Sequence, residues 1–254
     1  MNYNDTYNRK YDKIMDTIAF KNKRVTTIYM GSSTPAAEEG LTLAEFITDW
    51  DKGIKAYFHY VGRINERGPI DGHNTGYFAG ANVLLALAWW SYIKMPGREL
   101  PENSIWQVNE KENMKAEDYD FILNNGMDAM VQQLMPTLFP PEDFQKLMGS
   151  LQNAEQQAQA IIDIGYPLLA HGNIVPPFET LCGGRGMNNF FMDCYKIPDK
   201  IKAVQDVMME SIRKQVDQIP AEKYAIGTWI GGWRGASNLV NQKIWDKLVW
   251  PYIY

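Results

Sequence analysis

Short apolar runs alternate along this chain with longer amphipathic stretches, and this alternation constrains the fold more than any other feature. The strand-like runs are Val25–Tyr29, Ser104–Val108, Tyr166–Ala170 and Ala225–Ile230. The stretches between them have apolar side chains at helical spacing. Strands that alternate with helices usually form parallel βα units. The sequence therefore predicts an α/β protein, built either as a barrel or as a doubly wound sheet.

Apolar periodicity and capping residues locate the helices. A first amphipathic helix is expected from Tyr7 to Ile18, and Thr42 with Glu45 forms a capping-box pattern before an apolar face that continues to Val61. Residues Gly68–Gly76 are expected to form a loop. Further helices are expected over Asn82–Ile93, Glu117–Met130, Ser150–Ile162, from Pro198 to Ile219, and from Asn241 onward.

The stretch Gly165–Tyr195 is the strongest candidate for a functional segment. Its apolar run Tyr166–Ala170 predicts a buried strand, and a loop rich in glycine and proline is expected to follow, ending in a turn at Gly183–Gly186. In α/β enzymes the loops at the carboxyl ends of strands carry the chemistry. The alternative is a crossover loop whose glycines only permit sharp turns.

Composition excludes several classes of protein. The net charge of −5 and the lack of a Lys/Arg run among aromatics argue against a nucleic-acid surface. Two cysteines form neither a disulfide framework nor a pair of zinc-binding motifs. The most apolar run, Ala79–Ile93, is shorter than the roughly 20 residues of a membrane span. We expect a cytoplasmic protein without nucleic-acid or membrane partners.

Five polar residues are candidates for catalysis or anion binding. His171 directly follows a predicted strand and could act as an acid or base. Arg185 lies between two glycines and Arg234 lies in the run Gly231–Gly235, and each could hold a carboxylate or phosphate. His73 and Asn74, close to Asp71, lie in the predicted loop. The alternative for His171 is a histidine that is hydrogen-bonded in the core. For the two arginines it is a structural salt bridge, and for His73 it is a solvated turn.

Other residues suggest a surface for a ligand. Asn173 lies in the same loop as His171, and Trp229 and Trp233 could line a flat pocket, although large aromatics more often fill cores. Glu179 could cap a helix or take part in chemistry. Cys182 and Cys194 could in principle bind a soft metal, but they lack an obvious histidine partner.

Three segments carry a resemblance to a known family. They are Arg9–Ile18 followed by Lys23-Arg24-Val25, His171–Gly186 followed by Met192–Lys200, and Trp229–Ser237 continuing to Trp250–Ile253. In order and spacing these segments resemble the uroporphyrinogen decarboxylase family, which includes corrinoid-linked methyltransferases. The resemblance implies a (β/α)₈ TIM barrel. Only about four strands can be counted. Residues 1–254 are therefore expected to form a single, incomplete barrel domain that contains the first half to two-thirds of the barrel and is truncated at the C-terminus.

The resemblance also implies a reaction. The closest branch moves a methyl group between a corrinoid protein and a thiol or similar acceptor. Its zinc ligands lie in the later part of the barrel, so no metal site is expected within this chain, and the chain alone is expected to be inactive. Partners would be a corrinoid protein or a small tetrapyrrole, and a homodimer is possible.

Two alternatives remain open, a uroporphyrinogen decarboxylase and a non-catalytic partner subunit. The decarboxylases carry an Arg-Gln-Ala-Gly-Arg run after the first strand, whereas this chain has Met30–Thr34. Their aspartate after the second strand corresponds to His73-Asn74. These departures favour the methyltransferase branch.

Overall fold

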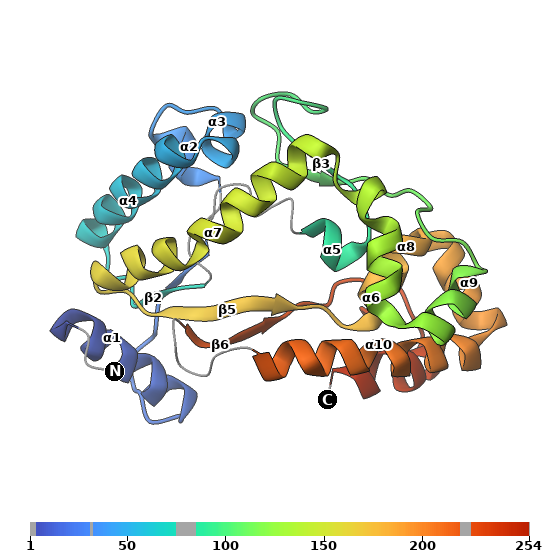
Figure 1. The fold of residues 1–254 in the computed structure, drawn as a ribbon. Coiled ribbons are helices and arrows are strands. Elements are labelled where there is room, and N and C mark those ends of the chain that lie inside the picture. The colour runs from blue at the N-terminus through green and yellow to red at the C-terminus, as the bar shows by residue number, and fades with distance from the viewer. Residues whose placement is uncertain (1–3, 31–32, 75–84, 219–224, 254) are drawn as a thin grey trace.

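The computed structural model describes residues 4–30, 33–74, 85–218 and 225–253. At its centre is a four-stranded sheet in the order β1-β2-β5-β6 (Figure 1). These strands are β1 (Ile28–Tyr29), β2 (Gly72–His73), β5 (Leu168–Ile174) and β6 (Ala225–Ile230). All three pairings are parallel. The predicted α/β class is therefore confirmed.

Helices account for most of the rest of the described chain. They are α1 (Asp5–Ile18), α2 (Thr34–Glu38), α3 (Leu43–Thr48), α4 (Trp50–Arg67), α5 (Leu85–Trp89), α6 (Asp118–Leu138), α7 (Pro141–Asp163), α8 (Pro177–Arg185), α9 (Met187–Lys196), α10 (Pro198–Gln218) and α11 (Gln242–Ile244). A π-helical turn, η2 (Trp245–Val249), and a 3₁₀ turn, η3 (Trp250–Tyr252), follow α11. In the view of Figure 1, α4 and α7 lie above the sheet and α1 and α10 below it. No helix of the described ranges is long and apolar enough to cross a membrane.

Three predictions in and around the sheets need correction, and the strand predicted over Ser104–Val108 is only partly confirmed. The run Ser104–Val108 contributes only β4 (Gln107–Val108), which pairs antiparallel with β3 (Ile93–Lys94) outside the main sheet. The sequence had placed Ile93 at the end of a helix, but in the described part of that stretch α5 ends at Trp89. The parallel strand β2 lies where a loop was expected. Strands of two residues are too short for apolar alternation to reveal them.

The central stretch also differs from its prediction. Strand β5 runs on through His171, Gly172 and Asn173, which were expected in a loop. The expected turn at Gly183–Gly186 is instead the end of helix α8, followed by Gly186 with a positive φ of 75°. A Cβ on Gly183 would lie 1.8 Å from the carbonyl oxygen of Trp89. The glycine at 183 therefore permits the backbones of α5 and α8 to touch.

Other helix predictions hold. The capping box of Thr42 and Glu45 is present, although Asp49 separates α3 from α4 where one continuous face was expected. Helix α10 begins at Pro198 as predicted. Helix α6 has a kink at Gly126, which has a φ of 84°. The predicted end of α10 near Pro220 lies outside the described residues.

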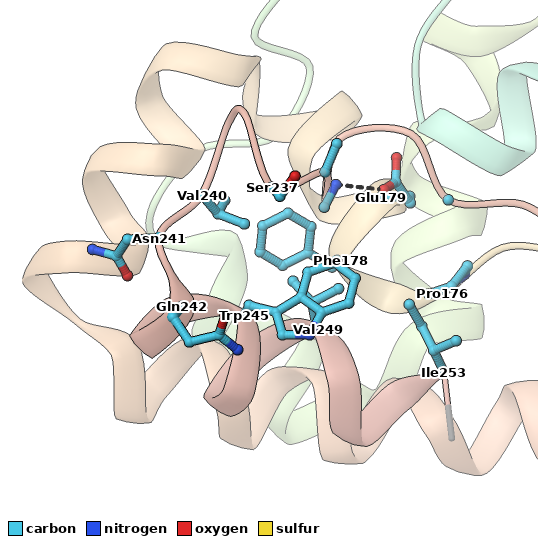
Figure 2. A pocket seen from close by; sticks show the side chains of 13 residues that line it. Pro176, Phe178, Glu179, Ser237, Val240, Asn241, Gln242, Trp245, Val249 and Ile253 are labelled. Carbon is cyan, nitrogen blue, oxygen red and sulfur yellow. Dashed lines mark hydrogen bonds between the residues drawn. The ribbon is translucent and has the colours of Figure 1, made fainter.

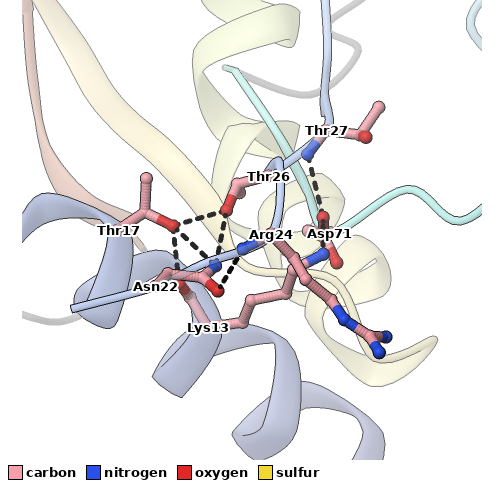
Figure 3. Close-up of polar contacts among 7 residues, drawn as sticks. All are labelled: Lys13, Thr17, Asn22, Arg24, Thr26, Thr27 and Asp71. Carbon is pink, nitrogen blue, oxygen red and sulfur yellow. Dashed lines mark hydrogen bonds and ion pairs between the residues drawn. The ribbon is translucent and has the colours of Figure 1, made fainter. Parts of the chain in front are cut away.

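Helix α1 is tied to the start of the sheet by the polar contacts in Figure 3. The Asp71 carboxylate accepts hydrogen bonds from Lys13 Nζ at 2.6 Å and from the backbone N–H of Thr27 at 2.8 Å. Thr17 and Thr26 share a hydrogen bond between their hydroxyls. Asp71 is buried, and both of these partners are structural. It holds β1 and β2 to α1 rather than joining His73 at a ligand site.

Candidate functional site

The turn that follows β6 is fixed by a buried carboxylate. Both oxygens of Glu179, in the first turn of α8, accept from the backbone N–H of Arg234, at 2.7 and 2.8 Å. Oε1 also accepts from the N–H of Gly235 at 2.9 Å, the contact drawn in Figure 2. Glu179 is 2% exposed. Its role is to hold the turn after one strand to the helix after the neighbouring strand, which fixes the place of Arg234.

Tryptophan side chains gather at the same turn. A Cβ on Gly231 would lie 2.5 Å from Cη2 of Trp233 and 3.3 Å from Nε1 of Trp229. The indoles of both tryptophans that were predicted to line a pocket therefore approach this glycine. The ring of Trp233 packs edge-on against Trp89, with centroids 5.2 Å apart. Trp106 extends the group, 6.2 Å from Trp89. We call this group of four tryptophans the aromatic wall; Trp233 is 47% exposed, whereas Trp89 is buried behind it.

The guanidinium of Arg234 lies beside this wall with unused hydrogen-bonding capacity. Its Nη2 donates to Glu110 Oε1 at 2.5 Å, and its Cζ lies 5.6 Å from the centre of the Trp89 ring. Among the described residues, the buried Nη1 has no hydrogen-bond partner. Arg234 is 7% exposed, whereas the side chain of Glu110 is 43% exposed. The carboxylate that this buried cation contacts is thus itself partly exposed to water.

Arg185 has a different environment, although the sequence cannot tell the two arginines apart. Its Nε donates to Asp193 at 2.9 Å, and its Nη1 donates to Glu112 and to the backbone oxygen of Met114. Asp193 also accepts from the hydroxyl of Tyr119 at 2.9 Å. Arg185 therefore joins α8, α9 and the start of α6, as a structural ion pair does.

Glu110 and Glu112 belong to one short segment, which we call the acidic strap (Glu110–Glu112). Just before it, the N–H of Asn109 donates to the oxygen of Tyr92 at 2.8 Å; just after it, that of Asn113 donates to Gly184 at 2.9 Å. The three strap residues are exposed. The two carboxylates meet different arginines: Glu110 accepts from Arg234, and Glu112 accepts from Arg185. A shallow hollow of about 310 Å³ adjoins it, lined by Glu110, Glu112, Arg185 and residues 186–189.

His73 does not join this group. Its register partner on β5 is Leu168, five residues before Asn173, which corresponds to roughly 16 Å along a strand. The ring is fully buried, and Nδ1 lies 2.5 Å from the hydroxyl of Tyr57 on α4. Asn74 continues the backbone ladder by donating to Tyr29 and accepting from Ala170, and it is half-buried.

A buried aromatic and cationic cluster surrounds His73. Its ring packs edge-on against Tyr166, with centroids 4.8 Å apart, and Lys10 Nζ lies 3.3 Å from the centre of the Tyr166 ring. Burial, with a smaller effect of the Lys10 charge, lowers the pKa of His73 to about 3. Burial also lowers the pKa of Lys10 to about 8, although the charge of Asp71 opposes this. His73 is therefore a neutral histidine of the core.

Asn173 and Trp229 are the predicted site residues that the sheet brings together. They are register partners across β5 and β6, at the carboxyl ends of both strands. Asn173 is exposed. His171 is also on β5, but its side chain lies outside the part that the structure describes.

A hollow of about 380 Å³ lies beyond the turn, between the start of α8 and the helical turns η2 and η3 (Figure 2). Apolar side chains line it, among them Phe178, Trp245 and Val249, with Glu179 and Ser237 at its edge. Such a mix of an apolar wall with a few polar groups is common in small-molecule sites.

The described residues do not fit a zinc ion. They contain no group of three or more His, Cys, Asp or Glu side chains that could hold a metal. Both cysteines are buried, and burial raises the pKa of each, to about 12 for Cys194. A thiolate, the form that binds zinc, is therefore disfavoured at both positions. Phe190, near Cys194 on α9, packs in the core against Phe178.

Sequence reasoning missed the residues that complete the group around Arg234. Trp89 looked like one more apolar residue of a helix, and Trp106 like part of a strand. Glu110 and Glu112 form no motif, and only the fold brings them to the arginines. The one available signal was that two carboxylates lie two residues apart in an otherwise polar stretch.

No protein family model, curated protein or solved structure matches this chain.

Proposed function

We propose that this protein belongs to the methyl-transfer branch of the uroporphyrinogen decarboxylase family and binds a corrinoid at the carboxyl ends of β5 and β6. In this reaction a methyl group passes between a corrinoid protein and a thiol or similar acceptor. The corrinoid is the substrate, and the residues around Arg234 position it.

The strand order supports a barrel of the family's type. In a (β/α)₈ barrel each strand lies parallel to the next strand of the sheet in chain order, as in β1-β2-β5-β6. A doubly wound sheet instead reverses its strand order at a switch point. We propose that these are four consecutive strands of such a barrel, with the β3–β4 hairpin as an insertion.

The observation that carries the proposed ligand is the buried, incompletely paired Arg234 beside the aromatic wall, of which Trp233 is exposed. A corrin ring is large and flat, which suits contact with the indoles of Trp229 and Trp233. Cobalamin also carries a phosphodiester, and a guanidinium binds phosphate oxygens through two parallel hydrogen bonds. The hollow beside Ser237 has room for a small acceptor.

The decarboxylase alternative receives less support. A substrate with many carboxylates needs several cations, because a buried carboxylate without a partner is costly. After β1 the chain has Met30–Thr34, with no arginine. Of the two candidate arginines, Arg185 is already paired with Asp193.

The test is to incubate the purified protein with methylcobalamin and a thiol and to follow the absorbance of the corrinoid. We expect thiol-dependent loss of methylcobalamin, or a saturable spectral change on binding if this chain alone does not turn over. Uroporphyrinogen serves as the second substrate. Formation of coproporphyrinogen, with no response to methylcobalamin, would reject the proposal in favour of the decarboxylase.

A further inference from the structure

We infer that Glu110 is an internal occupant of the anion site at Arg234, and that an oxyanion of the ligand binds there by displacing it. The inference rests on the proposed ligand site at Arg234, but not on the ligand being a corrinoid. It assigns to the acidic strap a role in limiting the affinity of that site.

The first argument is the asymmetry of the Glu110–Arg234 pair. Arg234 is buried while the carboxylate is 43% exposed, so Glu110 can rotate into water at little cost, whereas the guanidinium cannot. A buried guanidinium without a counter-ion is unfavourable, so Arg234 requires another anion whenever Glu110 leaves.

The second argument is that, within the described ranges, Nη1 of Arg234 has no hydrogen-bond partner. Only Nη2 donates to Glu110, so the carboxylate does not use the fork geometry of the guanidinium. A ligand carboxylate or phosphate that bridges both terminal nitrogens would gain a hydrogen bond that Glu110 does not make. This gives the ligand an advantage over the internal carboxylate.

The third argument is that the exchange needs no movement of the backbone. Asn109 and Asn113 anchor the strap on either side through their backbone N–H groups. Glu112 stays with Arg185, which Asp193 also holds. Rotation of one side chain would therefore open the anion site, while the aromatic wall of Trp89 and Trp233 stays in place.

The strap offers a matched pair of variants, Glu110→Gln and Glu112→Gln, which remove the same charge two residues apart. The probe is inorganic phosphate at constant ionic strength, with succinate as a carboxylate probe. Binding is followed by the fluorescence of the tryptophans beside Arg234. We expect Glu110→Gln to bind phosphate about tenfold more tightly than wild type, because one competing charge-assisted hydrogen bond is removed.

Glu112→Gln should bind phosphate as wild type does, and adding Arg234→Gln to Glu110→Gln should abolish the gain. Succinate binding tighter than phosphate would assign a carboxylate ligand; the reverse order would assign a phosphate. If Glu110→Gln does not fold, Glu110→Asp, whose shorter side chain loosens the pair, should show a smaller gain.

Unchanged phosphate affinity in the folded Glu110 variant would overturn the inference. An equal gain in Glu112→Gln would also overturn it, since the effect would then come from overall charge. Because neither probe contains a corrin ring, failure of corrinoid binding leaves this test intact.

Discussion

Glu179 accepts hydrogen bonds from the backbone N–H of Arg234 through both carboxylate oxygens, at 2.7 and 2.8 Å. One residue of α8 thereby fixes the turn after β6. The side chain of Arg234 then lies between Glu110 and the ring of Trp89. The candidate site thus depends on a buried carboxylate that accepts hydrogen bonds from backbone N–H groups.

Replacing Glu179 with Gln should destabilise the protein by about 1–3 kcal/mol, because an amide NH₂ would face the N–H of Arg234 and leave donors unpaired. Urea denaturation measures this change. Glu210→Gln, on the exposed face of α10, should change stability by no more than about 0.5 kcal/mol. Equal stability of the two variants would show that the buried carboxylate does not hold the turn.

Two glycine substitutions should act in opposite directions. Gly183→Ala places a methyl group 1.8 Å from the oxygen of Trp89 and should cost about 3 kcal/mol as α5 and α8 separate. In Gly62→Ala, within α4, the new methyl meets nothing within 4 Å, so the variant should gain about 0.5–1 kcal/mol. Calorimetric melting temperatures test both, and a Gly183→Ala protein as stable as wild type would refute the contact between α5 and α8.

Burial of His73 should make the protein less stable in mild acid. The folded-state pKa of about 3 lies below the ordinary value of 6.5, so the unfolded chain binds a proton below pH 6.5 that the native state does not. Stability is retained above pH 6.5 and should fall by about 2 kcal/mol between pH 7 and pH 5 from this group alone.

Unfolding measured at pH 7 and pH 5 tests this prediction. His73→Gln should remove that part of the loss, whereas His59→Gln keeps His73 and should retain it. A His73→Gln variant with the full wild-type loss would mean that the histidine is protonated in the folded protein.

The pairing of Arg185 should matter for stability and not for ligand binding. Asp193→Asn removes the less exposed of its two carboxylate partners and should cost about 3 kcal/mol. Glu112→Gln, at a side chain 47% exposed, should cost less than about 1 kcal/mol. Chemical denaturation distinguishes them. If Asp193→Asn instead leaves stability unchanged and weakens ligand binding, Arg185 is a ligand residue.

Long, regular elements were predictable from the sequence. β6 was predicted over the residues it occupies, and the capping box of α3 and the first residue of α10 were also correct. Apolar periodicity and capping chemistry are local, so the sequence alone expresses them.

Elements defined by distant partners were not predictable. Strand β2 has two residues, which are held by Tyr29 and Pro167 from other parts of the chain. The glycines at 183 and 184 suggested a turn, but they lie in a helix, where the lack of a side chain lets Trp89 and Trp90 approach closely. Arg185 and Arg234 have similar neighbours in the sequence, so they looked equivalent. Only their partners in the fold, Asp193 and Glu110, distinguish them.

The affinity for methylcobalamin, measured by quenching of tryptophan fluorescence, shows whether a corrinoid binds beside Arg234. Arg234→Gln is compared with Arg213→Gln, a matched change on the exposed face of α10. We predict saturable binding that Arg234→Gln weakens about tenfold, the equivalent of one charge-assisted hydrogen bond, and that Arg213→Gln leaves unchanged. Absence of saturable binding, or equal affinity in both variants, would contradict a corrinoid site at Arg234.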